Sequence, residues 1–307
     1  MIVPKSGKIL CVGRLYCDLV FSGIPKMPVR GEEVYADSLC IHAGGGAYIT
    51  AAYLAAIGQK TSLCAIYPSG PFGKAIESEI QNAGIDLSFC QSALPGADPQ
   101  VTVAIALRND RAFLTKRSGP SLPDTITQAL DDPALTHLHI AELATLAEHP
   151  DLPAMARNRG LSVSLDCSWD EDVICASDAR DLLRGIDLFL PNEKELRALF
   201  NIDGALENHR IEFTKHVPLV IVKKGKNGAS LYTPTSTHNA SAIDSDVVDT
   251  TGAGDAFNAG FLARWLNGEP LENCLAMGNT IGAEATKRIG GASGVASVSS
   301  QRHLVNH

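Results

Sequence analysis

Short apolar runs recur along the chain, and segments with helical periodicity separate them. The runs typical of buried strands are Ile9 to Val12, Ser62 to Ile66, Leu138 to Ala141, Leu161 to Asp166, Ile186 to Leu190 and Leu219 to Val222. Strands that alternate with helices form crossover units, which place the strands parallel in one sheet. The pattern therefore predicts an α/β fold with a doubly wound, mostly parallel sheet and helices on both faces.

Two segments do not follow this alternation. Residues 14–40 contain Asp18-Leu-Val-Phe, then a turn rich in proline and glycine, and then Glu33-Val-Tyr. Residues 101–116 alternate in polarity on both sides of a turn at Asn109-Asp110, which is a hairpin signal. We expect a small antiparallel β lid from residues 14–40 and 99–117, and a core from residues 1–13, 41–98 and 118–307.

Charge and hydropathy exclude several classes of protein. The chain has 26 lysine and arginine residues against 34 aspartate and glutamate residues, a net charge of −8 that argues against a nucleic-acid binder. We find neither a signal-peptide pattern nor a run of 18 uncharged apolar residues that would span a membrane. The eight cysteines include no C-x-x-C pair, as is typical of reduced thiols. We therefore expect a cytoplasmic protein that binds neither membranes nor nucleic acids.

The most informative segment is Val248-Asp249-Thr250-Thr251-Gly252-Ala253-Gly254-Asp255, followed by apolar residues at helical spacing up to Gly268. Small residues at a helix start let a ligand approach the backbone, where free N–H groups and the helix dipole favour an anion such as a phosphoryl group. Asp255 stands in that turn, where a carboxylate can accept a proton from an attacking hydroxyl. On the pattern alone, a tight turn capped by Asp255 is the alternative.

Asp249-Thr-Thr-Gly-Ala-Gly-Asp255 resembles the C-terminal signature of the PfkB, or ribokinase-like, carbohydrate kinases. Three further landmarks occur in the order of that family. They are Gly44-Gly45-Gly46 before a helix of small residues ending at Gly58, Pro191-Asn192-Glu193-Lys194-Glu195, and Val222-Lys223-Lys224-Gly225-Lys226-Asn227-Gly228. The resemblance covers about residues 8–295. It implies a ribokinase-like fold and an ATP-dependent kinase that phosphorylates a hydroxyl of a sugar or sugar-like molecule.

The resemblance also implies roles for the catalytic and metal-binding landmarks. Asp255 would be the catalytic base, and the backbone amides of residues 252–254 would hold the γ-phosphoryl group. Glu195 and Asn192 would act at Mg²⁺ through its water ligands, which suits a hard ion with few protein carboxylates. The alternative for this pair is a solvated helix start after Pro191.

The nucleotide and a monovalent cation are implied in the same way. The positions that match the nucleotide site are Lys223, Gly225, Gly228 and Asn279. Asn279 would lie by the adenine, and the alternative is a buried, hydrogen-bonded packing residue. Asp249 and Thr251 match positions whose carbonyls hold a monovalent cation in several relatives, so K⁺ joins ATP and Mg²⁺ among the expected ligands.

On the substrate side, Asp18 matches the sugar-binding aspartate of the family at the root of the lid. The alternative is an exposed aspartate at a strand edge. The other matched positions are Gly44, Gly45, Gly46 and Ile49. Ile49 stands where many sugar kinases have asparagine and Gly46 where ribokinases have lysine, which puts ribose specificity in doubt. Arg108, Arg111 and Arg117 flank the hairpin, where solvated edge charge is a simpler interpretation than contact with an acidic substrate.

Two alternatives to a sugar kinase stay open. One is a nucleoside (adenosine-type) kinase on the same fold, which Ile49 favours. The other is a non-catalytic regulator that binds nucleotide or sugar, against which stand Asp255, Glu195 and the glycines of the anion site. The edges of the lid also suggest a homodimer.

Overall fold

The computed structural model describes residues 5–106 and 111–300. Arg108 and the expected turn at Asn109-Asp110 lie outside these ranges. The strands are β1 (Lys8–Val12), β2 (Tyr16–Ser22), β3 (Ser38–Gly44), β4 (Thr61–Cys64), β5 (Ile66–Tyr67), β6 (Gln91–Ser92), β7 (Val101–Ala106), β8 (Arg111–Lys116), β9 (Leu135–Ile140), β10 (Ser162–Leu165), β11 (Leu188–Phe189), β12 (Leu219–Lys223), β13 (Ala229–Tyr232) and β14 (Thr237–Ala240).

The α-helices are α1 (Gly46–Ala56), α2 (Gly70–Gln81), α3 (Ile126–Leu130), α4 (Leu143–Glu148), α5 (Leu152–Arg157), α6 (Glu171–Ile174), α7 (Glu193–Phe200), α8 (Arg210–His216), α9 (Ala253–Leu266), α10 (Leu271–Ala285) and α11 (Val295–Ser300). Three short 3₁₀ helices are η1 (Ala179–Leu183), η2 (Leu206–His209) and η3 (Gly225–Asn227). Among these described helices, none is long and apolar enough to cross a membrane.

The large sheet has the strand order β14-β13-β12-β11-β10-β9-β1-β4. Its pairings from β12 to β4 are all parallel, and β13 and β14 add an antiparallel edge. Each apolar run expected to form a buried strand supplies one of the six parallel strands. The periodicity of the sequence therefore predicted this part of the sheet correctly.

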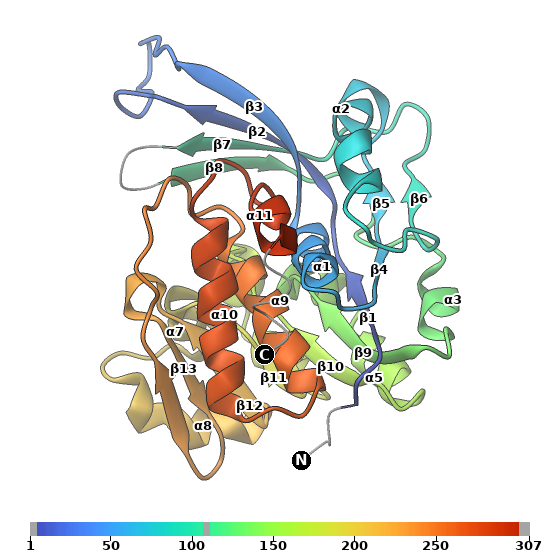
Figure 1. Cartoon of the computed structure of the whole chain (residues 1–307), viewed down its shortest axis with the longest axis vertical. Helices are drawn as coiled ribbons and strands as arrows, with labels where there is room; N and C mark the ends of the chain where they lie inside the picture. The colour runs from blue at the N-terminus through green and yellow to red at the C-terminus, as the bar shows by residue number, and fades with distance from the viewer. Residues whose placement is uncertain (1–4, 107–110, 301–307) are drawn as a thin grey trace.

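Two apolar cores cover the two faces of this sheet. Alternate side chains of β1 belong to different cores, with Ile9 and Cys11 on one face and Leu10 and Val12 on the other. Helices α1, α9 and α10 complete the first core, while α5, α7 and α8 contribute to the second. Figure 1 shows α1, α9 and α10 together in front of the sheet. Helices on both faces confirm the doubly wound fold.

The order of the strands reverses at β1. The chain leaves β1 for β4 on one side, and β9 then pairs with β1 on the other side. In open α/β sheets a ligand crevice forms at such a switch point, outside the carboxyl ends of the strands. The topology therefore places a ligand site beyond Val12 and Ile140.

A separate four-stranded sheet has the order β3-β2-β7-β8 and crosses the top of the molecule in Figure 1. The outer pairings, β2 with β3 and β7 with β8, are antiparallel, and β2 pairs in parallel with β7. Strand β3 continues to Gly44, beyond the lid limit at residue 40 expected from the sequence. The division of the chain into core and lid stays a prediction.

Arg14 joins the root of this small sheet to the core. Its side chain is buried, and Nη1 donates to Gln100 Oε1 at 2.8 Å and to the Gly119 carbonyl at 2.9 Å. Nη2 pairs with Glu148 Oε1 of α4 at 2.5 Å. The Arg14 guanidinium thus connects three segments of the chain, which lie before β2, before β7 and after β8. These contacts hold the small sheet over the switch point.

Candidate active site

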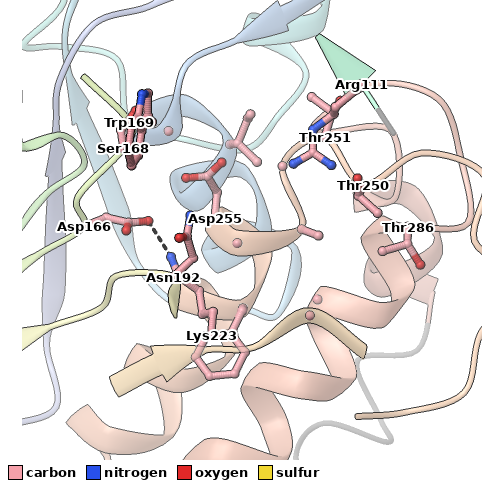
Figure 2. Close-up of a pocket in the computed structure, with 18 of the residues that line it drawn as sticks. Arg111, Asp166, Ser168, Trp169, Asn192, Lys223, Thr250, Thr251, Asp255 and Thr286 are labelled. Carbon is pink, nitrogen blue, oxygen red and sulfur yellow. Dashed lines mark hydrogen bonds and ion pairs between the residues drawn. The ribbon is translucent and has the colours of Figure 1, made fainter. Parts of the chain in front are cut away.

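A cleft of about 1230 Å³ opens where the carboxyl ends of the central strands face the small sheet. The residues expected at the site that line it are Asp18, Gly45, Gly46, Ile49, Asn192, Glu195, Lys223, Gly225, Gly228, Thr251, Gly252, Ala253, Gly254, Asp255 and Asn279. Figure 2 shows several of them around Asp255. Gly44 and Asp249 do not line the cleft, but each contacts a residue that does.

The turn before α9 is held in a conformation that only a few residues adopt. Gly252 has φ 73°, and a Cβ there would lie 2.5 Å from the Gly291 carbonyl oxygen. Asp249 Oδ1 accepts from the Thr251 backbone N–H at 2.9 Å and from its hydroxyl at 2.8 Å, while Oδ2 accepts from the Gly290 N–H at 2.9 Å. Asp249 therefore ties the glycine-rich turn to the loop at 290, which fixes the start of α9.

Asp255 lies in the first turn of α9 and faces the centre of the cleft (Figure 2). A Cβ on Gly46 would lie 2.8 Å from Asp255 Oδ1, so the glycine gives this carboxylate its space. Burial and the nearby charge of Asp166 raise the pKa of Asp255 to about 7, although Lys223 opposes the shift. A carboxyl group with such a pKa can accept a proton near neutral pH.

An ion pair connects three elements below Asp255. Lys223 Nζ, at the end of β12, lies 2.8 Å from Asp166 Oδ2, which follows β10. Asn258 of α9 donates to the same oxygen at 2.5 Å and accepts from Lys223 Nζ at 3.2 Å. Burial lowers the pKa of Lys223, but the negative charges of Asp166 and Glu195 raise it by more, so the pKa of Lys223 lies above its ordinary value. Neither Asp166 nor Asn258 was expected at the site, although Asp166 directly follows β10 and Asn258 lies in the second turn of α9.

Asn192 and Glu195 form a reciprocal cap at the start of α7. The Glu195 N–H donates to Asn192 Oδ1 at 2.9 Å, and the Asn192 N–H donates to Glu195 Oε2 at 2.8 Å. Glu195 is only 6% exposed, so the alternative of a solvated helix start is wrong for this residue. Burial and the charge of Asp166 raise the pKa of Glu195 to about 7.

The carboxylates of Asp166 and Glu195 are candidates to bind the expected Mg²⁺. Within residues 5–106 and 111–300, no group of three or more His, Cys, Asp or Glu side chains is placed to hold an ion directly. Asp166 and Glu195 nevertheless both line the cleft, and each raises the pKa of Asp255. Two carboxylates at one cleft fit a Mg²⁺ ion that keeps most of its waters.

Asp18 lies on β2, between β3 and β7, and is 7% exposed. The alternative of an exposed strand-edge aspartate is therefore wrong. A Cβ on Gly44 would lie 2.0 Å from Asp18 Oδ2, so the backbone of β3 passes directly over the carboxylate. Burial raises the pKa of Asp18 to about 7. Thr102 pairs with Asp18 across the sheet and also lines the cleft.

Two further buried residues, Ile49 and Glu142, line the cleft. Ile49 is buried, and a Cβ on Gly291 would lie 2.5 Å from its Cδ1, so Ile49 packs against the loop that Asp249 holds. Glu142 follows β9, lines the cleft and is 5% exposed, with a pKa that burial raises to about 7. Glu142 was not expected at the site, although a charged residue directly after the apolar run Leu138 to Ala141 is a signal that could have indicated it.

The other end of the cleft holds the expected nucleotide residues. Gly225 is the first residue of η3 and Gly228 directly follows it, and Asn279 of α10 lies against the end of β14. Asn279 Nδ2 donates to the carbonyls of Ala240 at 3.2 Å and Ser241 at 2.8 Å. Asn279 thus makes the bonds of a buried packing residue and still borders the cleft.

Strand β8 turns alternate side chains toward the cleft. Arg111, Phe113, Thr115 and Arg117 all line it, and Arg117 also pairs with Asp170 of the loop after β10. The interpretation of Arg111 and Arg117 as edge charge alone is therefore wrong. The alternation of polarity in the sequence was visible, but it could not show which face of the hairpin would meet the core.

The family model described as pfkB family carbohydrate kinase matches residues 6–297. The chain is 27% identical over 294 residues to an ATP-dependent ribose-1-phosphate kinase of Halopiger xanaduensis, covering 93% of this chain and 94% of that protein. It is 24% identical to a nucleoside kinase of Methanocaldococcus jannaschii, covering 88% and 87%. The structure of Arabidopsis thaliana ribokinase complexed with ribose and ATP superposes with a TM-score of 0.78 at 21% identity, covering 97% and 99%.

Proposed function

The chain belongs to the pfkB family of carbohydrate kinases, and on that premise we propose that it transfers the γ-phosphoryl group of ATP to a hydroxyl of a sugar or sugar-like substrate. The observation that carries the proposal is the position of Asp255. Its carboxylate stands at the N-terminal end of α9, in a cleft that also holds a buried carboxylate from the small sheet, Asp18. A candidate base, a helix N-terminus that favours an anion and a carboxylate that can bind hydroxyls thus line one cleft.

The step needs positioning and charge more than covalent help. Asp255 takes the proton of the acceptor hydroxyl while the oxygen of that hydroxyl bonds to the γ-phosphorus. The bond between that phosphorus and the bridging oxygen of ADP breaks, so the products are ADP and a phosphate ester. The backbone N–H groups at residues 252–254 would stabilise the equatorial oxygens of the phosphoryl group, and in this structure that of Ala253 donates to the Thr250 carbonyl at 3.3 Å.

Other residues bind and orient the substrates. Asp166 and Glu195 would hold a hydrated Mg²⁺, which supplies positive charge to the phosphates. Lys223 holds Asp166 in place and moderates the negative potential around Asp255. Asn192 keeps Glu195 at the cleft through the reciprocal cap. Gly225, Gly228 and Asn279 border the expected nucleotide end.

The substrate is expected to be larger or less polar than ribose. Ile49 offers an apolar surface where an amide would bind a hydroxyl, and Gly46 carries no cationic arm. Asp18 and Glu142 can each accept hydrogen bonds from hydroxyls of a polyol. The relatives named as a ribose-1-phosphate kinase and a nucleoside kinase are consistent with a derivative of a pentose.

A second proposal concerns assembly. Leu39, Ile41 and Leu114 of the small sheet are exposed, and the edges of this sheet are formed by β3 and β8. Exposed apolar side chains beside open strand edges favour pairing between subunits. A homodimer through the lid is therefore expected, and sedimentation of the purified chain measures it.

The test of the kinase proposal is Asp255→Asn, which keeps the shape of the side chain but replaces the basic carboxylate with a neutral amide. We expect kcat to fall by at least ~10², the usual scale for a general base, with unchanged melting temperature and ATP binding. ADP release over a panel of sugars and nucleosides is the assay. Wild-type turnover in this variant would refute the role of Asp255, and binding of ATP and acceptor without turnover in the wild type would favour the non-catalytic regulator.

A further inference from the structure

Two aromatic side chains of the cleft are much more exposed than Tyr16 and Phe257, which also line it. Trp169 is 41% exposed and Phe113 is 51% exposed, and both line the cleft. Each ring also contacts a cation, with Lys194 Nζ 3.9 Å from the Trp169 ring centroid and Arg111 Cζ 5.4 Å from that of Phe113. A cation against an aromatic face holds the ring by electrostatic attraction. Both rings are therefore positioned before any ligand arrives.

The position of Phe113 relative to Asp18 follows from the register of the small sheet. Asp18 pairs with Thr102, and Thr102 pairs with Thr115, so these residues form one row across β2, β7 and β8. Phe113 lies two residues along β8 from Thr115, about 7 Å at the rise of a strand, and faces the same side. Phe113 therefore lies in the next row of side chains on the face of the sheet that carries Asp18, the carboxylate expected to bind a substrate diol.

Trp169 approaches from the core. It lies three residues after Asp166, in the loop that follows β10, and its neighbour Asp170 pairs with Arg117 of the segment after β8. Figure 2 shows Trp169 and Ser168 above Asp166, beside Asp255. The loop thus carries an exposed indole to the substrate side of the cleft, and the ion pair with Arg117 connects the loop to the small sheet.

We propose that Trp169 and Phe113 form a subsite for the planar base of a nucleoside, whose ribose hydroxyls bind Asp18 while the acceptor hydroxyl faces Asp255. The inference rests on the proposed kinase function and specifies its substrate class. A bare sugar would leave most of both aromatic surfaces exposed to water, whereas a nucleobase has π-faces that stack on such rings. The apolar side chain of Ile49 adds to the same preference.

The binding test uses the intrinsic fluorescence of the protein. The sequence has two tryptophans, and Trp265 is 4% exposed in the core while Trp169 is 41% exposed. Adenosine and cytidine should therefore quench the fluorescence of Trp169 in the wild type and in Trp265→Phe, with no response in Trp169→Phe. Ribose and fructose should cause little change. Equal responses to ribose and to both nucleosides, or no response to either nucleoside, would overturn the subsite.

The kinetic test compares variants on both classes of acceptor. Trp169→Ala should lower kcat/KM for the best nucleoside about 5- to 100-fold, the scale of one base stack, and leave KM for ATP unchanged. Trp169→Phe should recover most of the loss, and Leu94→Ala, an exposed side chain outside the cleft, is the matched control. Equal losses on sugars and nucleosides, or a bare sugar as the best acceptor, would refute the nucleoside subsite and leave the kinase proposal intact. An absence of transfer to every acceptor would instead refute the kinase proposal, and the quenching experiment would still decide the subsite.

Discussion

Lys223→Met should change both the stability of the protein and the pH dependence of its activity. The side chains of Lys223 and Asp166 are 12% and 9% exposed, so the substitution leaves a buried carboxylate without its cation. Removing one partner of a buried pair costs about 3–5 kcal/mol. Asp166 keeps hydrogen bonds from Asn258 and the Cys167 N–H, so we expect the lower end, about 3 kcal/mol.

The loss in melting temperature follows from the size of the chain. Unfolding entropy is about 2.1 cal/mol/K per residue, so for 307 residues a loss of about 3 kcal/mol lowers Tm by about 5 °C. Lys226→Met is the control, because Lys226 is an exposed lysine at the same cleft. Differential scanning calorimetry measures the change, and an unchanged Tm in Lys223→Met would contradict the stabilising role of the pair.

The structure also predicts the direction in which each substitution shifts the pH dependence of kcat. Lys223 lowers the pKa of Asp255, and Asp166 raises it. Because the base must be ionised, kcat should rise as the pH increases through about 7, the pKa of Asp255. Lys223→Met should move this rise to higher pH, and Asp166→Asn should move it to lower pH. Initial rates between about pH 5 and pH 9 give both profiles, and shifts of the same sign would refute the electrostatic argument.

Four further perturbations test the remaining parts of the site. Gly46→Ala places a methyl group 2.8 Å from Asp255 Oδ1 and should lower kcat with little change in ATP binding, so wild-type kcat would contradict the close approach. Asp18→Ala should raise KM and lower kcat together, because a hydrogen bond to a charged group contributes roughly 1.5–3 kcal/mol. Normal kinetics of this variant on the best acceptor would disprove the substrate pocket. A higher kcat/KM of the wild type for ribose than for every larger acceptor would disprove it as well. Glu195→Gln should raise the Mg²⁺ concentration needed for half-maximal rate, and full activity in excess chelator would show that no metal is needed. K⁺ should stimulate more than Na⁺ if the segment at Asp249 borders a cation, and equal rates in the two salts would argue against it.

Several features of the site followed from short sequence patterns. Gly252 and Asp255 were recognised because a glycine-rich helix start is a local feature. The reciprocal cap of Asn192 and Glu195 is also local, since its members are three residues apart. In contrast, Lys223 and Asp166 are 57 residues apart and Asn258 and Asp166 are 92 apart, so no spacing rule indicated that they would share one hydrogen-bond network.

The sequence by itself determined the alternation of strands and helices, the existence of the small sheet and the start of α9. These depend on periodicity, turn residues and backbone freedom, which are properties of neighbouring residues. Only the tertiary structure decided that Asp18, Glu142, Glu195 and Asp255 would be desolvated around one cleft and that Trp169 would face it. The pKa values and partners of these groups depend on burial and on charges brought from distant segments, and folding alone creates both.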